Sequence, residues 1–258
     1  METTDVSPVM ALDRGLRIFS CLADMRRASL SAISSETGIP APTVHRALAT
    51  LQNRGLVSQD GTDGKWRIGP QAYRIGNAFE PGSNLLEIAP PIMRALAAET
   101  GETANLAIEN GGALLYLVQV ESDNPIRASI KNGTTTRFHT SGVGKIIMAH
   151  MDAGRLESLL RKSKLEAQTP KSITDVAQLK HELQRCRAQG WAIDDEERFL
   201  GMRCIAAPIF DVLGRVIAGL SISGPTTRFP DDQLEAMAAR VTRAAAQISN
   251  GLQQSPEA

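Results

Sequence analysis

Cysteine is scarce in this 258-residue chain, and it contains no long apolar run. Three cysteines without a CxxC pair argue against a disulfide framework and against a structural zinc site. No apolar run approaches the roughly 20 residues that a membrane-spanning helix needs. The first eight residues are polar and acidic and show no secretory signal pattern. We therefore expect a cytoplasmic protein with no membrane partner, no metal and no cofactor.

The composition is that of a folded globular protein, with 42% apolar and 22% charged residues. At roughly 150 residues per domain, the length predicts one or two domains. The net charge of zero conceals an asymmetry, because residues 10–76 carry nine Lys and Arg against five Asp and Glu. From residue 77 onward, nineteen basic residues face twenty-one acidic ones. The positive excess near the N-terminus gives mild support for a nucleic-acid-binding module.

Three helices, with a short turn between the second and the third, are predicted in the first 55 residues. Apolar residues at helical spacing place the first helix over residues 9–24. Ser31 is the expected N-cap of a second helix over residues 31–37. The third helix is expected over residues 41–54, with Pro42 in its first turn. This pattern is typical of a helix-turn-helix, and an ordinary three-helix bundle fits it equally well.

The third predicted helix separates apolar side chains from polar ones. Its polar face carries Thr43, His45, Arg46 and Thr50. A recognition helix places its N-terminal residues against base edges in the major groove, where Arg46 would contact guanine. Thr43 and His45 would reach bases or phosphates. Ser31 and Thr50 complete the contacts expected from these two helices.

A basic hairpin follows the third helix and favours the DNA-binding interpretation. Two Asp-Gly pairs within residues 60–64 predict a turn between strands over 56–59 and 65–68. Strand alternation places Lys65 and Arg67 together on one face. Cations on such a face suit contact with DNA phosphates. We interpret the hairpin as the wing of a winged helix-turn-helix.

The rest of the chain predicts a second domain after a linker helix over Tyr73–Phe79 and a break at Glu80–Ser83. Strands and helices without strict alternation predict an α+β domain on one mainly antiparallel sheet. Strands are expected over residues 103–109, 113–120, 126–130, 191–194, 204–210 and 216–223. Helices are expected from 85 to 100 with a break at Pro90-Pro91, and over 142–150, 155–161, 176–189 and 234–252. The expected organisation is a tail (1–8), the winged domain (9–69), linker helix and boundary (70–82), the second domain (83–252) and a tail (253–258).

Two polar features of the second domain are candidates for a binding site. Thr140–Lys145 precedes an apolar helix, and exposed amides at a helix N-terminus attract anions. It is not a phosphate-binding P-loop, because Ile146 stands where that motif requires Ser or Thr. Ser221 and Ser223 alternate with apolar residues, so both hydroxyls point to one side of a strand. The simpler alternatives are a capped helix with a glycine packing contact and the solvated face of an edge strand.

A thiol enzyme is a further alternative, with Cys204 as the nucleophile and His139 as the base. Residue type alone favours this pairing, because nothing in the spacing of the two residues does. Cys204 also opens an apolar strand, where a lone cysteine is normally a small core residue. We therefore expect no catalytic residues.

Several stretches resemble, in order and spacing, the IclR family of bacterial transcription regulators. They are Ala11–Leu16, Pro42–Arg46, Gly142–Lys145, Asp194–Glu197, Gly201–Ala207 and Ser221–Pro225. The resemblance spans nearly the whole chain. Asp194–Glu197 and Ser221–Pro225 are especially similar to the glyoxylate-responsive repressors of the acetate operon and of allantoin utilisation.

The resemblance implies a winged helix-turn-helix domain followed by a GAF/PAS-like effector-binding domain. It also implies homodimers or homotetramers on a double-stranded, pseudo-palindromic DNA operator, and a small 2-oxo acid as effector. The effector site carried over by motif consists of Gly142, Val143, Asp194, Met202, Cys204, Ser221 and Ser223. The amides of the first two would hold a carboxylate, the serines would donate hydroxyls, and the methionine would supply apolar cover. Phe138 is expected to narrow this pocket and Arg137 to change its charge.

The leading hypothesis is a DNA-binding regulator whose operator affinity responds to glyoxylate first and pyruvate second. One alternative is an IclR-type regulator of another small carboxylate or of an aromatic acid. Others are a thiol enzyme acting on a small oxo acid and a nucleoid-type protein whose DNA binding is indifferent to sequence. The resemblance is compatible with a repressor or an activator, since both occur in the family.

Overall fold

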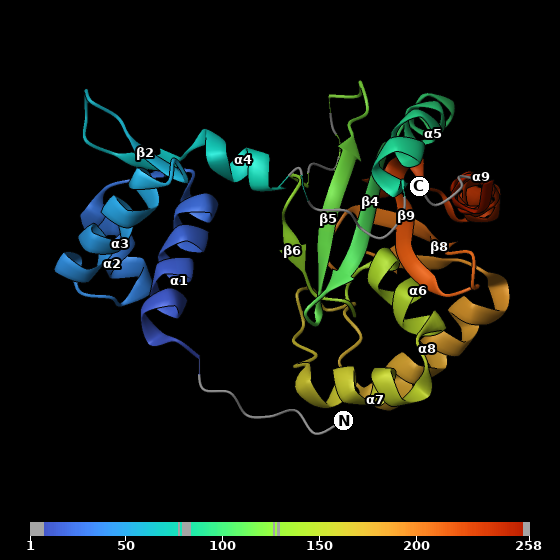
Figure 1. Cartoon of the computed structure of the whole chain (residues 1–258). Coiled ribbons are helices and arrows are strands. Elements are labelled where there is room, and N and C mark those ends of the chain that lie inside the picture. The colour runs from blue at the N-terminus through green and yellow to red at the C-terminus, as the bar shows by residue number, and fades with distance from the viewer. Residues whose placement is uncertain (1–7, 77, 79–83, 126, 128–129, 255–258) are drawn as a thin grey trace. The chain divides into compact units, whose positions relative to one another are not determined.

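The computed structural model describes residues 8–76, 78, 84–125, 127 and 130–254 (Figure 1). The chain folds as two compact units, Met1–Glu80 and Pro81–Ala258. The predicted domain boundary at Glu80–Ser83 lies outside the described residues. In the described ranges, no helix has both the length and the apolar content needed to cross a membrane.

The first unit combines helices with a small antiparallel sheet. Its elements, coloured blue to cyan in Figure 1, are α1 (Met10–Met25), β1 (Arg27–Ala28), α2 (Leu30–Thr37), α3 (Ala41–Asn53), β2 (Val57–Gln59), β3 (Trp66–Ile68) and α4 (Pro70–Gly76). The sheet order is β1-β3-β2. Ile18 and Leu22 of α1, Leu48 of α3 and Trp66 of β3 meet in one buried core. This is the predicted winged helix-turn-helix.

Three details of this unit differ from the sequence prediction. Ser29, and not Ser31, is the N-cap of α2, because its extended backbone lets its Oγ accept from the Ala32 N–H at 3.2 Å. The linker helix α4 begins at Pro70 and ends at Gly76, earlier than predicted, and Phe79 lies outside the described residues. Strand β1 was not predicted, because two residues are too few to show alternation.

The second unit is a six-stranded sheet with helices on both faces. Its strands are β4 (Thr103–Asn110), β5 (Ala113–Val120), β6 (Thr135–Thr136), β7 (Ala192–Asp195), β8 (Met202–Phe210) and β9 (Val216–Pro225). Every pair of neighbours in the order β6-β5-β4-β9-β8-β7 is antiparallel. The helices are α5 (Leu85–Thr100), α6 (Gly142–His150), α7 (Ala153–Lys162), α8 (Val176–Gln189) and α9 (Leu234–Gln254), with 3₁₀ turns at Thr226–Arg228 and Asp231–Gln233. This is the predicted α+β domain.

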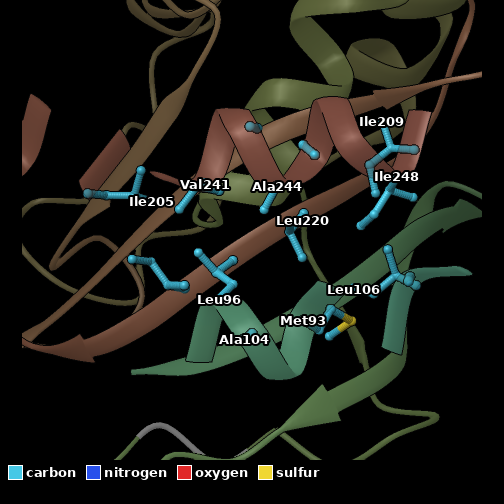
Figure 2. Packing of buried hydrophobic residues seen from close by; sticks show 14 of the residues in the cluster. Met93, Leu96, Ala104, Leu106, Ile205, Ile209, Leu220, Val241, Ala244 and Ile248 are labelled. Carbon is cyan, nitrogen blue, oxygen red and sulfur yellow. The ribbon is translucent and has the colours of Figure 1, made fainter. Parts of the chain in front are cut away.

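Strand alternation gives the sheet two chemically different faces. One face packs against α5 and α9 in an apolar core, part of which is shown in Figure 2. The side chains labelled there are Met93, Leu96, Ala104, Leu106, Ile205, Ile209, Leu220, Val241, Ala244 and Ile248. The opposite face packs against α6 and α8 in a second apolar cluster. Burial of apolar surface on both faces is the main driving force for folding this unit.

Two predictions for the second unit were wrong. Helix α5 continues through Pro90 and Pro91 without the predicted break. Proline lacks the N–H that would bond the carbonyl four residues earlier. The carbonyls affected belong to Leu86 and Glu87, which are exposed residues, so water can take the place of the missing donors. The predicted strand over residues 126–130 is not formed at its described positions 127 and 130, and β6 borders β5 instead.

Candidate functional site

The polar side chains predicted to read DNA lie on the outer face of α3. His45, Arg46 and Thr50 are exposed and Thr43 is half-buried, while Val44 and Leu48 on the other face are fully buried. Thr50 donates its hydroxyl to the Arg46 carbonyl oxygen at 2.8 Å, so this group is already used within the helix. Within the described ranges, no carboxylate pairs with the Arg46 guanidinium. Arg46 is therefore available to a DNA base.

The wing presents its predicted cations together with a clamp that sequence reasoning missed. Arg67 of β3 and Lys65, the residue before this strand, are both exposed. Arg27 of β1 donates from Nη2 to Asp60 Oδ2 at 2.7 Å and to Asp63 Oδ1 at 3.0 Å. Local backbone hydrogen bonds, assisted by the Arg27 charge, lower the pKa of both aspartates. Arg27 thus holds the acidic turn of the wing, and Lys65 adds a second positive charge 3.6 Å from Asp63 Oδ2.

The second unit contains a cavity of about 220 Å³. It is lined by Tyr116, Arg127, Ile130, Ser141, Asp194, Arg198, Phe199, Met202, Arg203, Cys204 and Ser223. Four of the seven predicted effector residues are among them, namely Asp194, Met202, Cys204 and Ser223. Gly142, Val143 and Ser221 are not on this lining and lie in or beside the packed interior.

Sheet register brings the polar lining residues together. Asp194 on β7 pairs with Cys204 on β8, which in turn pairs with Ser223 on β9. Directly aligned residues of an antiparallel sheet project to the same face. Asn105, which was not predicted, donates from Nδ2 to Ser223 Oγ at 3.3 Å and accepts from Gln119 Nε2 at 2.9 Å. This chain of bonds orients the Ser223 hydroxyl.

The N-terminus of α6 borders the cavity through its cap. Ser141 is the N-cap, and its Oγ accepts from the Gly144 N–H. By helix geometry, the N–H groups of Gly142 and Val143 have no intrahelical acceptor. A Cβ on Gly142 would lie 3.0 Å from the Cys204 carbonyl oxygen, and one on Gly144 would lie 2.0 Å from the Phe138 carbonyl oxygen. Packing therefore requires glycine at position 144.

Ser221 occupies the row of the sheet next to Ser223, on the same face. Its register partners are Asn105 on β4 and Ala206 on β8. The Ser221 hydroxyl is fully buried and has no hydrogen-bond partner in the described part of the chain. The Val143 side chain is also fully buried, and a Cβ added at Gly219 would lie 2.7 Å from its Cγ1. Any contact of Val143 with a ligand would therefore come from its backbone.

Burial shifts the acidic groups of the cavity toward their protonated forms. Burial, and then the nearby Glu197 carboxylate, raise the pKa of Asp194 to about 7. Burial also raises the pKa of the Tyr116 hydroxyl and of the Cys204 thiol. Oδ1 of Asp194 accepts from the backbone N–H groups of Glu197 at 2.8 Å and of Arg198 at 3.3 Å. These two bonds shape the turn that follows β7.

Arg198 on this turn is a candidate functional residue that sequence reasoning missed. Two other guanidinium groups line the cavity, but Arg127 pairs with Glu121 at 2.9 Å, and Arg203 pairs with Asp195 at 2.6 Å. Arg198 has no carboxylate partner among the described residues, and its guanidinium carbon lies 5.1 Å from the centre of the Phe199 ring. It was missed because a single cation after an acidic run carries no periodic signal.

A buried charge cluster contacts the turn after β7 through Glu197. Lys145 of α6 is 1% exposed, and its Nζ bonds Glu197 and lies 3.4 Å from Glu182 Oε1 of α8. Burial alone would lower the pKa of Lys145, but the two carboxylates outweigh this effect and raise it. For Glu197 burial outweighs the attraction of Lys145, so its pKa is raised. The cluster joins α6 and α8 to the segment that carries Arg198.

The structure corrects the expectations for Arg137 and Phe138 and does not form the alternative pairing of Cys204 with His139. His139 does not approach Cys204, because its Nε2 lies 3.0 Å from the Glu166 carbonyl oxygen in a separate hollow. Arg137 and Phe138 line that second hollow, so neither narrows nor charges the 220 Å³ cavity. Over the described ranges, no group of three or more His, Cys, Asp and Glu is placed to hold a metal ion.

Comparison with known proteins covers both units. The family model of the IclR helix-turn-helix domain matches residues 11–61, and that of the bacterial transcriptional regulator IclR C-terminal domain matches residues 81–250. HTH-type transcriptional regulator BhcR of Paracoccus denitrificans is 44% identical over 248 residues, which cover 96% of this chain and 89% of the relative. Transcriptional repressor IclR of Escherichia coli is 36% identical over 244 residues, covering 93% and 89%.

The fold is also shared with solved structures. An IclR homologue from Microbacterium hydrocarbonoxydans, complexed with 4-hydroxybenzoate, superposes with a TM-score of 0.85 at 23% identity, covering 95% of this chain and 100% of the homologue. The first unit is a DNA-binding domain, and both the family models and the relatives are transcriptional regulators rather than enzymes. This chain belongs to the IclR family of bacterial transcriptional regulators.

Proposed function

We propose that this regulator binds operator DNA through its first unit and that a small 2-oxo acid bound in its second unit changes the operator affinity. Glyoxylate is the first candidate effector and pyruvate the second. The observation that supports an acid effector most directly is Arg198, which lines the 220 Å³ cavity and lacks a carboxylate partner among the described residues. A cationic group beside polar hydrogen-bond donors is suited to a small anion.

The cavity offers the donors that a buried carboxylate requires. Burying an ionised carboxylate without partners is very costly, so several donors must converge on it. Arg198 supplies a charge-assisted donor on the lining, and the amides of Gly142 and Val143, which follow the lining residue Ser141, lie at the positive end of α6. Because Ser223 accepts from Asn105, its own O–H remains able to donate to a ligand. Cys204 and Met202 would then contact the less polar side of the acid.

The size of the cavity supports a compact ligand. At roughly 30 Å³ per water molecule, 220 Å³ corresponds to about seven waters. A three-carbon or smaller acid would occupy part of this space and leave bridging water between its oxygens and the polar wall. Ser221 lies behind Ser223 with an unused hydroxyl, and we assign it a supporting role at the back of the site.

An aromatic acid is the alternative class of effector. The Microbacterium homologue of the same fold is complexed with 4-hydroxybenzoate. In this chain the rings of Tyr116 and Phe199 line the cavity and would contact an aromatic ligand. Titration with 4-hydroxybenzoate beside glyoxylate and pyruvate separates the two candidates.

On the DNA side, we assign base contacts to the N-terminal half of α3. Arg46 would read guanine in the major groove, and Thr43 and His45 would contact neighbouring bases or phosphates. Lys65 and Arg67 of the wing would contact phosphates. Ser31 at the start of α2 and Thr50 farther along α3 are assigned peripheral contacts with the DNA backbone.

We further propose that the protein acts as a homodimer or homotetramer on a pseudo-palindromic operator. Leu12 and Leu16 of α1 are 60% and 53% exposed, which leaves an apolar stripe of the DNA-binding unit for a second copy to cover. A two-fold dimer places two recognition helices on half-sites about one helical turn apart.

The test is a fluorescence-anisotropy titration of the full-length protein against DNA from upstream of its own gene. Random-sequence DNA of the same length serves as the control, at one fixed salt concentration. We expect the upstream DNA to bind roughly 10³-fold tighter than the control and this affinity to change with millimolar glyoxylate. A tenfold change requires the effector to discriminate between the two protein states by about 1.4 kcal/mol. Tight binding that ignores every acid tested would contradict the effector assignment.

Matched variants separate the two sites. Arg46→Ala should abolish specific DNA binding with folding intact and leave acid binding unchanged. Arg198→Gln, Ser221→Ala and Ser223→Ala should weaken acid binding in calorimetry while DNA binding without effector persists. Arg137→Gln removes an exposed guanidinium from the neighbouring hollow and should change neither property. If Arg198→Gln and Arg137→Gln behave alike, the assigned anion site is wrong.

A further inference from the structure

A second carboxylate inside an acid-binding cavity is a physical problem. Asp194 lines the cavity and is 7% exposed, and an effector carboxylate would lie in the same 220 Å³. Two like charges in a shared site with little water cannot both remain ionised at ordinary cost. Something in the site must compensate for the second negative charge.

The charged groups around Asp194 leave little compensation for a second anion. On its own turn lie Glu197, which is bonded to Lys145 of α6, and Arg198. Lys145 is shared with Glu182 of α8. Arg203 of β8 pairs with Asp195 and Asp231, Arg127 pairs with Glu121, and the Cys204 thiol and the Tyr116 hydroxyl are neutral. Among the described lining residues this leaves Arg198, a single cation for two carboxylates.

We propose, as a step that rests on the proposed function, that Asp194 takes up one proton from solvent when the effector anion binds. The neutral Asp194 then donates a hydrogen bond from its carboxyl group to the 2-oxo oxygen of the effector. Its Oδ1 continues to accept from the Glu197 and Arg198 amides, so the turn keeps its shape. No covalent bond forms or breaks, and the buffer supplies the proton.

This role makes Asp194 a specificity-determining residue. A monoanionic 2-oxo acid leaves one negative charge for Arg198 and an acceptor oxygen for protonated Asp194. Oxalate has nearly the same size and shape as glyoxylate but carries a second charge at neutral pH. Protonation removes the charge of Asp194, and Arg198 pairs with one carboxylate of the ligand. The second carboxylate of oxalate would have no partner, so we expect oxalate to bind much more weakly than glyoxylate.

The protonation is inexpensive near neutral pH. Burial and the Glu197 carboxylate already hold the pKa of Asp194 at about 7. Tyr116 and Cys204 cannot be the source of a coupled proton change, because their raised pKa values keep both protonated at neutral pH. Glu197 is hydrogen-bonded to Lys145. Asp194 is therefore the group expected to take up a proton from solvent when the anion binds.

The experiment is isothermal titration calorimetry of the full-length protein with glyoxylate in two buffers of different ionisation enthalpy. The difference in observed heat gives the number of protons taken up. We expect close to one proton at about pH 8 and close to none at about pH 5.5, where Asp194 is already protonated. The affinity should fall by up to about tenfold per pH unit above pH 7. Oxalate is titrated under the same conditions.

Two variants identify the group responsible. Asp194→Asn keeps an acceptor for the Glu197 and Arg198 amides, and its glyoxylate binding should take up no proton and lose its pH dependence. Ser223→Ala is the matched control on the same wall, and it should bind more weakly with the proton uptake unchanged. Binding without proton uptake, or uptake that persists in Asp194→Asn, overturns this inference and leaves the proposed function standing. Failure of both glyoxylate and pyruvate to bind at either pH overturns the proposed function and this inference with it.

Discussion

Replacing Lys145 by methionine tests the buried charge cluster beneath the cavity. Methionine preserves most of the side-chain volume and removes the charge. Lys145 is 1% exposed, and its partners Glu197 and Glu182 are 7% and 12% exposed. Without the ammonium group, Glu197 retains no cationic partner among the described residues, whereas Glu182 keeps Arg185 at 2.8 Å. The uncompensated charge in the variant is therefore chiefly that of Glu197.

Breaking a buried ion pair by removing one partner costs about 3–5 kcal/mol. Because Glu182 keeps a partner, we expect a loss near 3 kcal/mol in the free energy of unfolding of the second unit. For a unit of this size, that corresponds to a fall of about 6–12 °C in Tm. Adding Glu197→Gln to Lys145→Met should restore most of the loss, because the buried carboxylate is then replaced by a neutral amide.

The loss should depend on pH in a defined direction. In Lys145→Met, the pKa of Glu197 rises further above its unfolded value, so this carboxyl binds a proton more readily in the folded state. A group of this kind reduces stability as pH rises from its unfolded pKa through its folded pKa. The deficit of the variant should therefore be largest near pH 8 and should shrink toward pH 5.5.

Urea denaturation followed by tryptophan fluorescence measures this effect. The chain has two tryptophans, one in each unit, so a Trp66→Phe background makes Trp191 the reporter for the second unit. A loss below about 1 kcal/mol, or an equal loss at both pH values, would refute the reasoning that Lys145 compensates a buried charge.

Three further predictions concern single residues. Asp194→Asn should raise the free energy of unfolding by about 2–4 kcal/mol near pH 8 and by about 1 kcal/mol near pH 5. The reason is that the raised pKa of the wild-type carboxyl lowers the stability of the wild type as pH rises from about 4 to 7. Urea denaturation of both proteins across this pH range measures the difference. Arg27→Gln should weaken operator binding more than Arg26→Gln, since Arg27, unlike Arg26, bonds both aspartates of the wing turn. Equal effects in anisotropy would make charge alone responsible. Gly144→Ala should overpack against Phe138 and lower the free energy of unfolding by about 1–3 kcal/mol, which thermal denaturation would detect as a lower Tm. Gly154→Ala near the start of α7 should raise the Tm slightly.

Local patterns in the sequence were sufficient for most elements and for the two faces of the DNA-binding unit. Helical spacing predicted α3 with its polar face, and the Asp-Gly pairs predicted the wing turn. The same rules failed where context outweighed them. Pro90 and Pro91 did not end α5, because the residues whose carbonyls they leave without helical donors are exposed and can bond water.

The candidate site was only partly predictable, because much of it depends on contacts between distant segments. Motif resemblance and strand alternation indicated Asp194, Cys204 and Ser223, which register then aligns across three strands. Arg198 reaches the cavity through a turn built on Asp194 Oδ1, and no local pattern reports that turn. Lys145 and Glu197 likewise come from α6 and from the turn after β7, so their pairing becomes visible only in three dimensions.

The two-faced sheet also separates the chemistry of the cavity from the packing that keeps the unit folded. Cys204 lines the cavity, whereas its chain neighbour Ile205 belongs to the core under α5 and α9. Likewise on β9, Ser223 lines the cavity and Ile222 belongs to the core. Substitutions in the polar row would therefore change the chemistry of the cavity without repacking the core.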